Sequence, residues 1–272
     1  MNTRAPTVKV VTRLLGAALL VAAACTSANE SGVRLDPAPV HRLDVDSLQH
    51  GAAIFVNYCL NCHGAQFMRY NRLTGLGLTE DQISDNLMFA TDKMGSTMTA
   101  AMSKADAAAW FGAPPPDLSV EARVRGKDWL YSYLLGFYRD EQSITGWNNL
   151  VFRNVVMPHV LWNLSGTQKL VETEYEDEEK AEAGAIAAKG LALAEPLANG
   201  KWVVKTLAQD TPGKMSPVEY KAFVADLVNF LDYIAEPVRN ERITIGIVVM
   251  IYLGLLFAFA YALKRSYWKD IH

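Results

Sequence analysis

Apolar residues are gathered most densely at the two ends of the chain, and the C-terminal run is the longer of the two. Residues 243–263 contain no charged side chain, and a helix needs roughly 20 apolar residues to cross a bilayer. This stretch therefore predicts a single transmembrane helix. Lys264, Arg265 and Lys269 follow it, and positive charge favours the cytoplasmic side of a membrane. We expect a cytoplasmic tail at 264–272 and an exported body before the helix.

The N-terminal apolar run is shorter and has a different character. An apolar segment at 14–24 follows a basic start that includes Arg4 and Lys9, and it is too short to cross a bilayer as a helix. This layout is typical of a secretory signal peptide, which we place at 1–28. Export of the body agrees with the orientation expected for the C-terminal helix. The sequence leaves open the cleavage site and whether Cys25 carries a lipid.

The body between these ends, 29–242, shows the periodicity of helices more than that of strands. Apolar positions within 46–58 recur at helical spacing, and Asp46 or Ser47 could cap the start of this helix. The segment 216–234 is strongly amphipathic and begins with a capping box. We therefore predict a mainly α domain with long, proline-containing loops. Further helices are expected at 79–111 and 127–138, a proline break lies at 112–116, and the best strand signal is at 201–205.

Two of the three cysteines in this 272-residue chain lie in one motif, NYCLNCHGA. Cys59 and Cys62 are separated by two residues, and His63 follows directly. A redox dithiol of the thioredoxin type needs an adjacent βαβ pattern, which the sequence does not show. A zinc site normally needs four ligands, and the other histidines show no paired ligand spacing. Both interpretations therefore lack their usual sequence context.

Attachment of a c-type haem accounts for all three side chains, and C-x-x-C-H is its short signature. Residues three apart on a helix share a face, so Cys59 and Cys62 can both form thioethers to the same porphyrin. His63 then reaches the iron as the proximal ligand. Export of the body, and the lack of any other cysteine in it, favour this interpretation over chance. We expect one haem c.

A haem that transfers electrons usually has methionine or histidine opposite the proximal histidine. Met157 lies in an irregular segment before Pro158, which biases it towards extended geometry, so a loop could place its thioether over the ring. Met215 precedes a helix and stays an alternative, and His159 is a minor one. Met94, Met98 and Met102 have the spacing of one helix face and are interpreted as packing residues, and Met68, Met88 and Met250 are set aside.

Together with several longer blocks, these residues resemble the cytochrome c1 family in its bacterial form. The likeness covers nearly the whole body and the C-terminal helix. It implies a class I cytochrome c-type haem domain with a C-terminal anchor, and it implies that Met157 is the distal iron ligand. The matching blocks are SLQHGAAIFVNYCLNCHGA, PPPDLSVEARVRGKDWLYSYLLGFYRD, NVVMPHVLW, MSPVEYKAFVADLVNFLDYIAEP and KRSYWKDI.

The resemblance also implies roles for residues around the haem. In the family the PPDLS block lies against the haem edge, so Pro115 and Pro116 are expected to line the pocket. Arg125, more than Arg123, is expected to pair with a haem propionate, because a guanidinium matches a carboxylate with two hydrogen bonds. In this fold the helix before the haem motif crosses the late helix. The expected crossing residues are Gly51, Phe55, Phe230 and Tyr233.

One departure from some relatives concerns the distal loop. Those relatives have extra cysteines whose disulfide steadies the loop near the distal methionine. Here the only spare cysteine is Cys25, which belongs to the predicted signal region. Met157 must therefore be held by packing and hydrogen bonds alone.

The function that the resemblance implies is single-electron transfer within the respiratory ubiquinol–cytochrome c reductase, or cytochrome bc1, complex of the bacterial inner membrane. The implied donor is the Rieske iron–sulfur protein, and the acceptor is a soluble or anchored cytochrome c. Cytochrome b is a further implied partner, and the haem domain would lie in the periplasm. Quinol oxidation would belong to the partner subunits, so we expect no independent catalytic residue in this chain.

Charge adds little to this assignment. The formal net charge of −3 gives no reason to expect nucleic acid as a partner. Seven acids within 172–182 are by default a solvated surface, although such a run could steer a basic electron acceptor. Two other classes stay open: a free membrane-anchored cytochrome, and a haem sensor or peroxidase-like enzyme with an exchangeable distal position.

Overall fold

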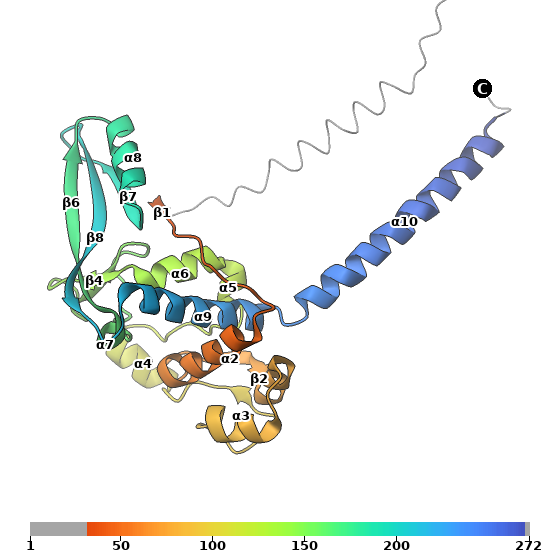
Figure 1. Cartoon of the computed structure of the whole chain (residues 1–272), viewed down its shortest axis with the longest axis horizontal. Helices are drawn as coiled ribbons and strands as arrows, with labels where there is room; N and C mark the ends of the chain where they lie inside the picture. The colour runs from red at the N-terminus through yellow and green to blue at the C-terminus, as the bar shows by residue number, and fades with distance from the viewer. Residues whose placement is uncertain (1–31, 270–272) are drawn as a thin grey trace, which may run out of the picture.

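The computed structural model describes residues 32–269 (Figure 1). The predicted signal peptide, 1–28, and Cys25 therefore lie outside the described residues. Helix is the predominant regular structure, at about 47%, and the predicted mainly α class is confirmed. The α-helices are α2 (Val45–Ile54), α3 (Glu80–Leu87), α4 (Lys104–Phe111), α5 (Glu121–Val124), α6 (Lys127–Leu135), α7 (Trp162–Ser165), α8 (Glu178–Ala187), α9 (Pro217–Ala235) and α10 (Arg239–Tyr267). A π-helix, η1 (Phe55–Cys59), continues α2, and a 3-10 helix, η2 (Tyr70–Leu76), precedes α3.

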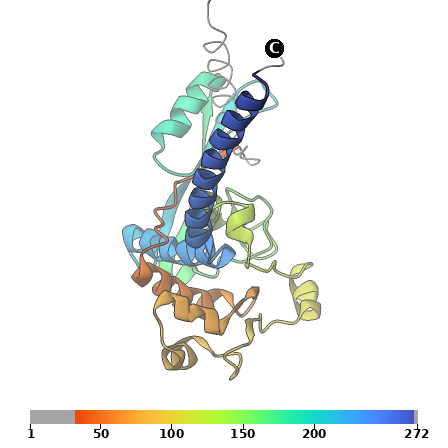
Figure 2. The same ribbon diagram turned by 90° about the vertical axis from the view of Figure 1, so that its right-hand side faces the viewer.

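The body also contains strands, which the sequence indicated only weakly. A four-stranded antiparallel sheet has the order β1-β7-β8-β6, and two small two-stranded sheets pair β2 with β3 and β4 with β5. In both views the far end of this sheet, with α8, lies at the opposite end of the body from α2 and α3 (Figures 1 and 2). The strands are β1 (Val33–Arg34), β2 (Ala65–Arg69), β3 (Thr97–Met98), β4 (Phe137–Arg139), β5 (Trp147–Asn149), β6 (Gly166–Tyr175), β7 (Ala192–Pro196) and β8 (Trp202–Pro212).

The crossing of α2 over α9 forms the centre of the haem-motif half of the body. A methyl group added at Gly51 would lie only 2.1 Å from the backbone oxygen of Asp226, so the helices approach too closely for any side chain. One turn later the rings of Phe55 and Phe230 lie 5.7 Å apart. These three crossing residues are confirmed. Tyr233, the fourth, instead places its hydroxyl beside Gly75 of η2.

Several predicted helix boundaries need correction. The cap of α2 is Asp44, whose carboxylate accepts from the Ser47 backbone N–H at 3.1 Å; neither Asp46 nor Ser47 is the cap. The expected helix at 79–111 is interrupted, because only α3 and α4 are helical there. Met94 and Met98 consequently lie in a turn and in β3, not on one helix face. The predicted capping box at the start of α9 is confirmed.

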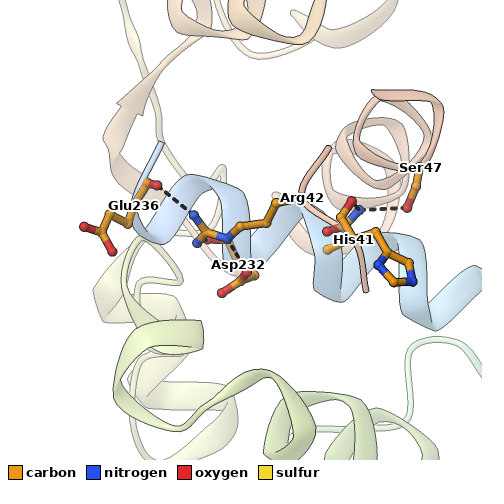
Figure 3. Close-up of polar contacts among 6 residues, drawn as sticks. His41, Arg42, Ser47, Asp232 and Glu236 are labelled. Atoms are coloured by element: carbon orange, nitrogen blue, oxygen red, sulfur yellow. Dashed lines mark hydrogen bonds and ion pairs between the residues drawn. The ribbon is translucent and has the colours of Figure 1, made fainter. Parts of the chain in front are cut away.

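The N-terminal segment is fastened to the end of α9 by one arginine (Figure 3). The Arg42 guanidinium forms an ion pair with the Asp232 carboxylate and donates to the backbone oxygens of Asp232 and Glu236. Both side chains of the ion pair are mostly buried, at 14% and 13% exposure. Breaking such a pair is costly, because it leaves an uncompensated charge. The contacts of Arg42 therefore hold the end of α9 in place directly before the anchor begins.

Helix α10 leaves the body and makes no buried contact within the described chain. It is the one helix among residues 32–269 that is long and apolar enough to cross a membrane. It extends beyond the predicted span, 243–263, at both ends. The Glu236 carboxylate, just before it, pairs with Arg242 in its first turn, which links the end of α9 to the anchor.

Candidate functional site

The two motif cysteines come together at the end of η1. The backbone N–H groups of Cys62 and His63 both donate to the carbonyl of Cys59, at 3.0 and 2.8 Å. This turn brings both half-buried thiols and the imidazole to one place, and neither cysteine forms a disulfide.

Burial raises the pKa of both motif thiols. Burial raises the pKa of the Cys59 thiol to about 12, and the neighbouring Cys62 adds to the effect. Redox-active and metal-binding cysteines need the thiolate, and their pKa is usually lowered. Within residues 32–269, no cluster of three or more His, Cys, Asp or Glu side chains could hold a metal ion. Among the described residues, the structure thus adds no further metal ligand to this pair of thiols.

The His63 ring is oriented by a backbone carbonyl. Its Nδ1 lies 2.8 Å from the Pro116 oxygen. A carbonyl only accepts hydrogen bonds, so Nδ1 carries the proton and Nε2 keeps its lone pair. Burial lowers the pKa of His63, and the bond to Pro116 partly offsets this. The neutral tautomer is the form that binds a metal through Nε2.

The block that follows the prolines is clamped to the haem motif by further hydrogen bonds. The Leu118 N–H donates to the Gly64 carbonyl at 2.7 Å. The Asp117 carboxylate accepts from the Gln66 N–H at 2.9 Å, and the buried Ser119 hydroxyl accepts from the Phe67 N–H at 3.0 Å. These side chains hold the 115–119 loop in the position that lets Pro116 reach His63.

Met157 lies in a bend, as expected from the proline that follows it, and its side chain is half-buried. The hydroxyl of Tyr133, on α6, donates to the Met157 sulfur at 3.3 Å. Met157 also packs against a small buried cluster formed by Phe137, Trp147 and Val155. The thioether is thus held from one side by α6 and by the β4–β5 hairpin.

Two asparagines hold the loop that leads to Met157. The Asn148 side-chain oxygen accepts from the N–H of Asn154 at 2.9 Å, and its amide donates to Asp140 at 2.8 Å. The Asn149 oxygen accepts from the N–H of Val151 at 2.9 Å, and its amide donates to the backbone of Tyr133 at 2.8 Å. Hydrogen bonds therefore hold the loop that carries Met157, as the sequence predicts for a chain without a disulfide there.

His159 is accounted for by packing. It is only 3% exposed, its Nε2 lies 2.8 Å from the Ser165 hydroxyl, and its ring stacks on Phe137 at 4.8 Å. Burial lowers its pKa to about 4. It serves as a neutral support for the loop after Met157.

Most of the other methionines are also accounted for by packing. Met68, Met88 and Met98 are buried in the main core, at 2%, 8% and 0% exposure. Met215 packs against that core ahead of α9. Met157 is the methionine whose sulfur accepts a hydrogen bond within the described residues, and its loop lies outside regular structure.

The structure separates the two candidate arginines. Arg125 lies over Trp129 at 4.8 Å and over Phe152 at 5.9 Å, in a row of rings that leads to Tyr133 and Met157. The Glu236 pKa is lowered, chiefly by the hydrogen bond from Arg242, with Arg123 adding a weaker attraction. Arg123 therefore lies within electrostatic reach of Glu236. Arg125 also pairs with Glu121 at 3.8 Å, and the prediction that one of these arginines pairs with a haem propionate stays open.

The acidic run 172–182 falls at the end of β6 and in α8, away from the haem motif. Part of its charge is compensated locally. Lys201 pairs with Glu174 and Glu176 at 3.6 Å, and Lys205 lies 3.5 Å from Glu172. This placement gives no support to a docking role at the haem.

Sequence reasoning missed several residues that build the site. In the sequence, Tyr133 is one of several aromatic residues within 127–138. Asn148 and Asn149 belong to no motif that would mark them as site residues. Asp117 and Ser119 could have been found, because both side chains commonly bond nearby backbone groups after a proline break.

A family model described as "Cytochrome C1 family" matches residues 37–271. The chain belongs to the cytochrome c1 family. It is 42% identical over 261 residues to the cytochrome c1 of Allochromatium vinosum, covering 95% of this chain and 98% of that protein. It is 26% identical over 244 residues to the mitochondrial cytochrome c1, heme protein, of Neurospora crassa, covering 83% and 62%. A protein of Nitrosomonas europaea named "Ammonia monooxygenase gamma subunit" is 44% identical over 255 residues, covering 94% and 96%.

Family membership establishes what the protein is for. It is a haem subunit of the cytochrome bc1 complex that carries electrons, and it has one covalently attached c-type haem. The protein is anchored in a membrane, and α10 is the helix suited to that task. The residues at the motif fit the cofactor, since they offer two unpaired thiols and an imidazole whose Nε2 has no hydrogen-bond partner within residues 32–269.

Proposed function

We propose that Cys59 and Cys62 form the two thioethers to the haem, that His63 is the proximal iron ligand, and that Met157 is the distal one. The hydrogen bond from His63 to Pro116 is the observation that carries this proposal. It fixes the neutral tautomer with the proton on Nδ1, so the lone pair of Nε2 is free to bind the iron.

The bound haem supplies a carrier whose iron accepts and releases one electron. The chain's own residues hold and tune it. The carbonyl of Pro116 strengthens His63 as a donor, as partners behind a metal ligand commonly do. Asn148, Asn149 and His159 hold the Met157 loop in place of a disulfide. Arg125, with Pro115 and Pro116, would lie at the haem edge.

The proposed arrangement in the membrane follows from charge and from the signal peptide. Residues 1–28 are removed on export, and 29–242 form a periplasmic haem domain. Residues 243–263 cross the inner membrane, and 264–272, with Lys264, Arg265 and Lys269, lie in the cytoplasm.

The proposed electron donor is a Rieske iron–sulfur protein, and the proposed acceptor is a soluble or anchored cytochrome c. Cytochrome b would be the membrane partner of α10. These assignments rest on membership of the bc1 complex, and no separate catalytic group is assigned to this chain.

Purification of the tagged full-length protein from detergent-solubilised membranes tests these partners. We expect haem-stained protein to copurify with a cytochrome b and an iron–sulfur subunit. Isolation of the haem protein alone would instead favour a free anchored cytochrome, and recovery with monooxygenase subunits would favour the assembly named for the Nitrosomonas relative.

Binding of carbon monoxide at neutral pH would show an exchangeable distal position, as in a sensor or peroxidase-like protein.

A further inference from the structure

Tyr133 is the one side chain whose polar atom contacts the Met157 sulfur within the described residues. A thioether has no proton, so the phenol must be the donor. The phenol keeps its proton at neutral pH, because its ordinary pKa is about 10. The direction of this hydrogen bond is therefore fixed by chemistry.

The phenol is also fixed in position. The Trp129 ring stacks on Tyr133 with a centroid distance of 5.0 Å and an interplanar angle of 7°. The Phe137 ring packs edge-on against it at 5.1 Å. Held between these rings, Tyr133 has little freedom to turn its hydroxyl away from Met157.

The backbone of Tyr133 contacts the same loop. Its carbonyl accepts from the Asn149 amide at 2.8 Å, and Asn149 in turn binds the N–H of Val151. One residue of α6 thus holds the loop through its main chain and the sulfur through its side chain. This double contact ties both the loop and the sulfur to α6.

We propose that Tyr133 is a positioning and tuning residue for electron transfer, which donates a hydrogen bond to the distal thioether and so sets how strongly that sulfur binds the iron. This inference rests on the proposed ligation by Met157. A hydrogen bond to the sulfur withdraws electron density from it. When the sulfur becomes a weaker donor, the ferric state loses more stabilisation than the ferrous state does. The hydrogen bond therefore raises the reduction potential.

The test is Tyr133→Phe in the full-length protein, measured by redox titration and by the ferric methionine–iron band. We expect the potential to fall, with the ferric-to-ferrous ratio at a fixed applied potential rising about threefold to tenfold, which corresponds to about 30–60 mV for one electron. The ferric band should shift, because the sulfur becomes a stronger donor. The haem content should stay the same.

Tyr131→Phe is the matched control. It removes a hydroxyl group from the same helix, but Tyr131 is buried in the main core. We therefore expect Tyr131→Phe to leave the reduction potential unchanged. A ring-fluorinated tyrosine at position 133 is a stronger donor and should move the potential upwards. This second variant keeps the test decisive if Tyr133→Phe fails to mature.

The outcomes also separate the two proposals. If the unaltered protein shows the ferric methionine–iron band, Met157→Ala abolishes it, and neither variant at position 133 moves the potential, the role of Tyr133 is wrong and the ligation by Met157 stands. If the unaltered protein lacks that band, the ligation by Met157 is wrong and the role of Tyr133 falls with it.

Discussion

Met157→Ala is expected to abolish the ferric methionine–iron band and to lower the reduction potential by on the order of 0.2 V, a fraction of the roughly 0.8 V that axial ligands span. Methionine raises the potential of a c-type haem, so its loss has this sign. The covalent bonds through Cys59 and Cys62 are independent of the distal ligand. Haem staining should therefore persist while the spectrum changes, and carbon monoxide should gain access to the iron.

Met215→Ala is the control for this experiment, because Met215 was the other methionine that the sequence left open. Its side chain packs against the main core, so its loss should reduce stability without changing the potential. A Met157→Ala protein that keeps both its ferric band and its potential would refute the axial assignment.

Gly51→Ala is expected to destabilise the haem domain by roughly 3 kcal/mol, within the range of severe overpacking. Helix propensity alone predicts the opposite sign, since alanine is about 1 kcal/mol better than glycine inside a helix. The added carbon would lie 2.1 Å from the Asp226 carbonyl and 2.7 Å from the Phe230 Cβ. The backbone oxygen cannot move aside, so α2 must separate from α9.

Because α2 continues directly into η1 and Cys59, this separation also displaces the haem motif. Thermal unfolding of the mature protein in detergent should show a midpoint lower by roughly 6–12 °C, or the haem-stained protein should not accumulate. Gly95→Ala is the matched control, because nothing lies within 4 Å of its added carbon. Equal stability of the Gly51→Ala and unaltered proteins would show that the helices can separate at no cost.

The parts of the fold that the sequence predicted are those in which local pattern and tertiary structure agree. The capping box at Ser216 and the apolar stripe behind it marked α9 to within a residue. The uncharged run 243–263 marked the anchor. The haem motif was identified because Cys59, Cys62 and His63 are adjacent in the chain, so no knowledge of the fold was needed.

The parts that the sequence did not predict depend on contacts between distant segments. Strand β6 is rich in charged and polar residues and has no strong alternation. It is a strand because it pairs with β8 along its whole length. The bond from Tyr133 to Met157 joins residues 24 positions apart, and that from His63 to Pro116 joins residues 53 apart. The spacing of residues along the sequence predicts neither contact.

Mass spectrometry of the peptide that spans Cys59 to His63, prepared from mature membranes of the native host, tests the central claim most directly. We predict that this peptide is heavier by one haem, and that Cys59→Ser and Cys62→Ser each remove one of the two covalent links. An unmodified peptide with two free thiols, from membranes in which other c-type cytochromes are fully matured, would contradict the account.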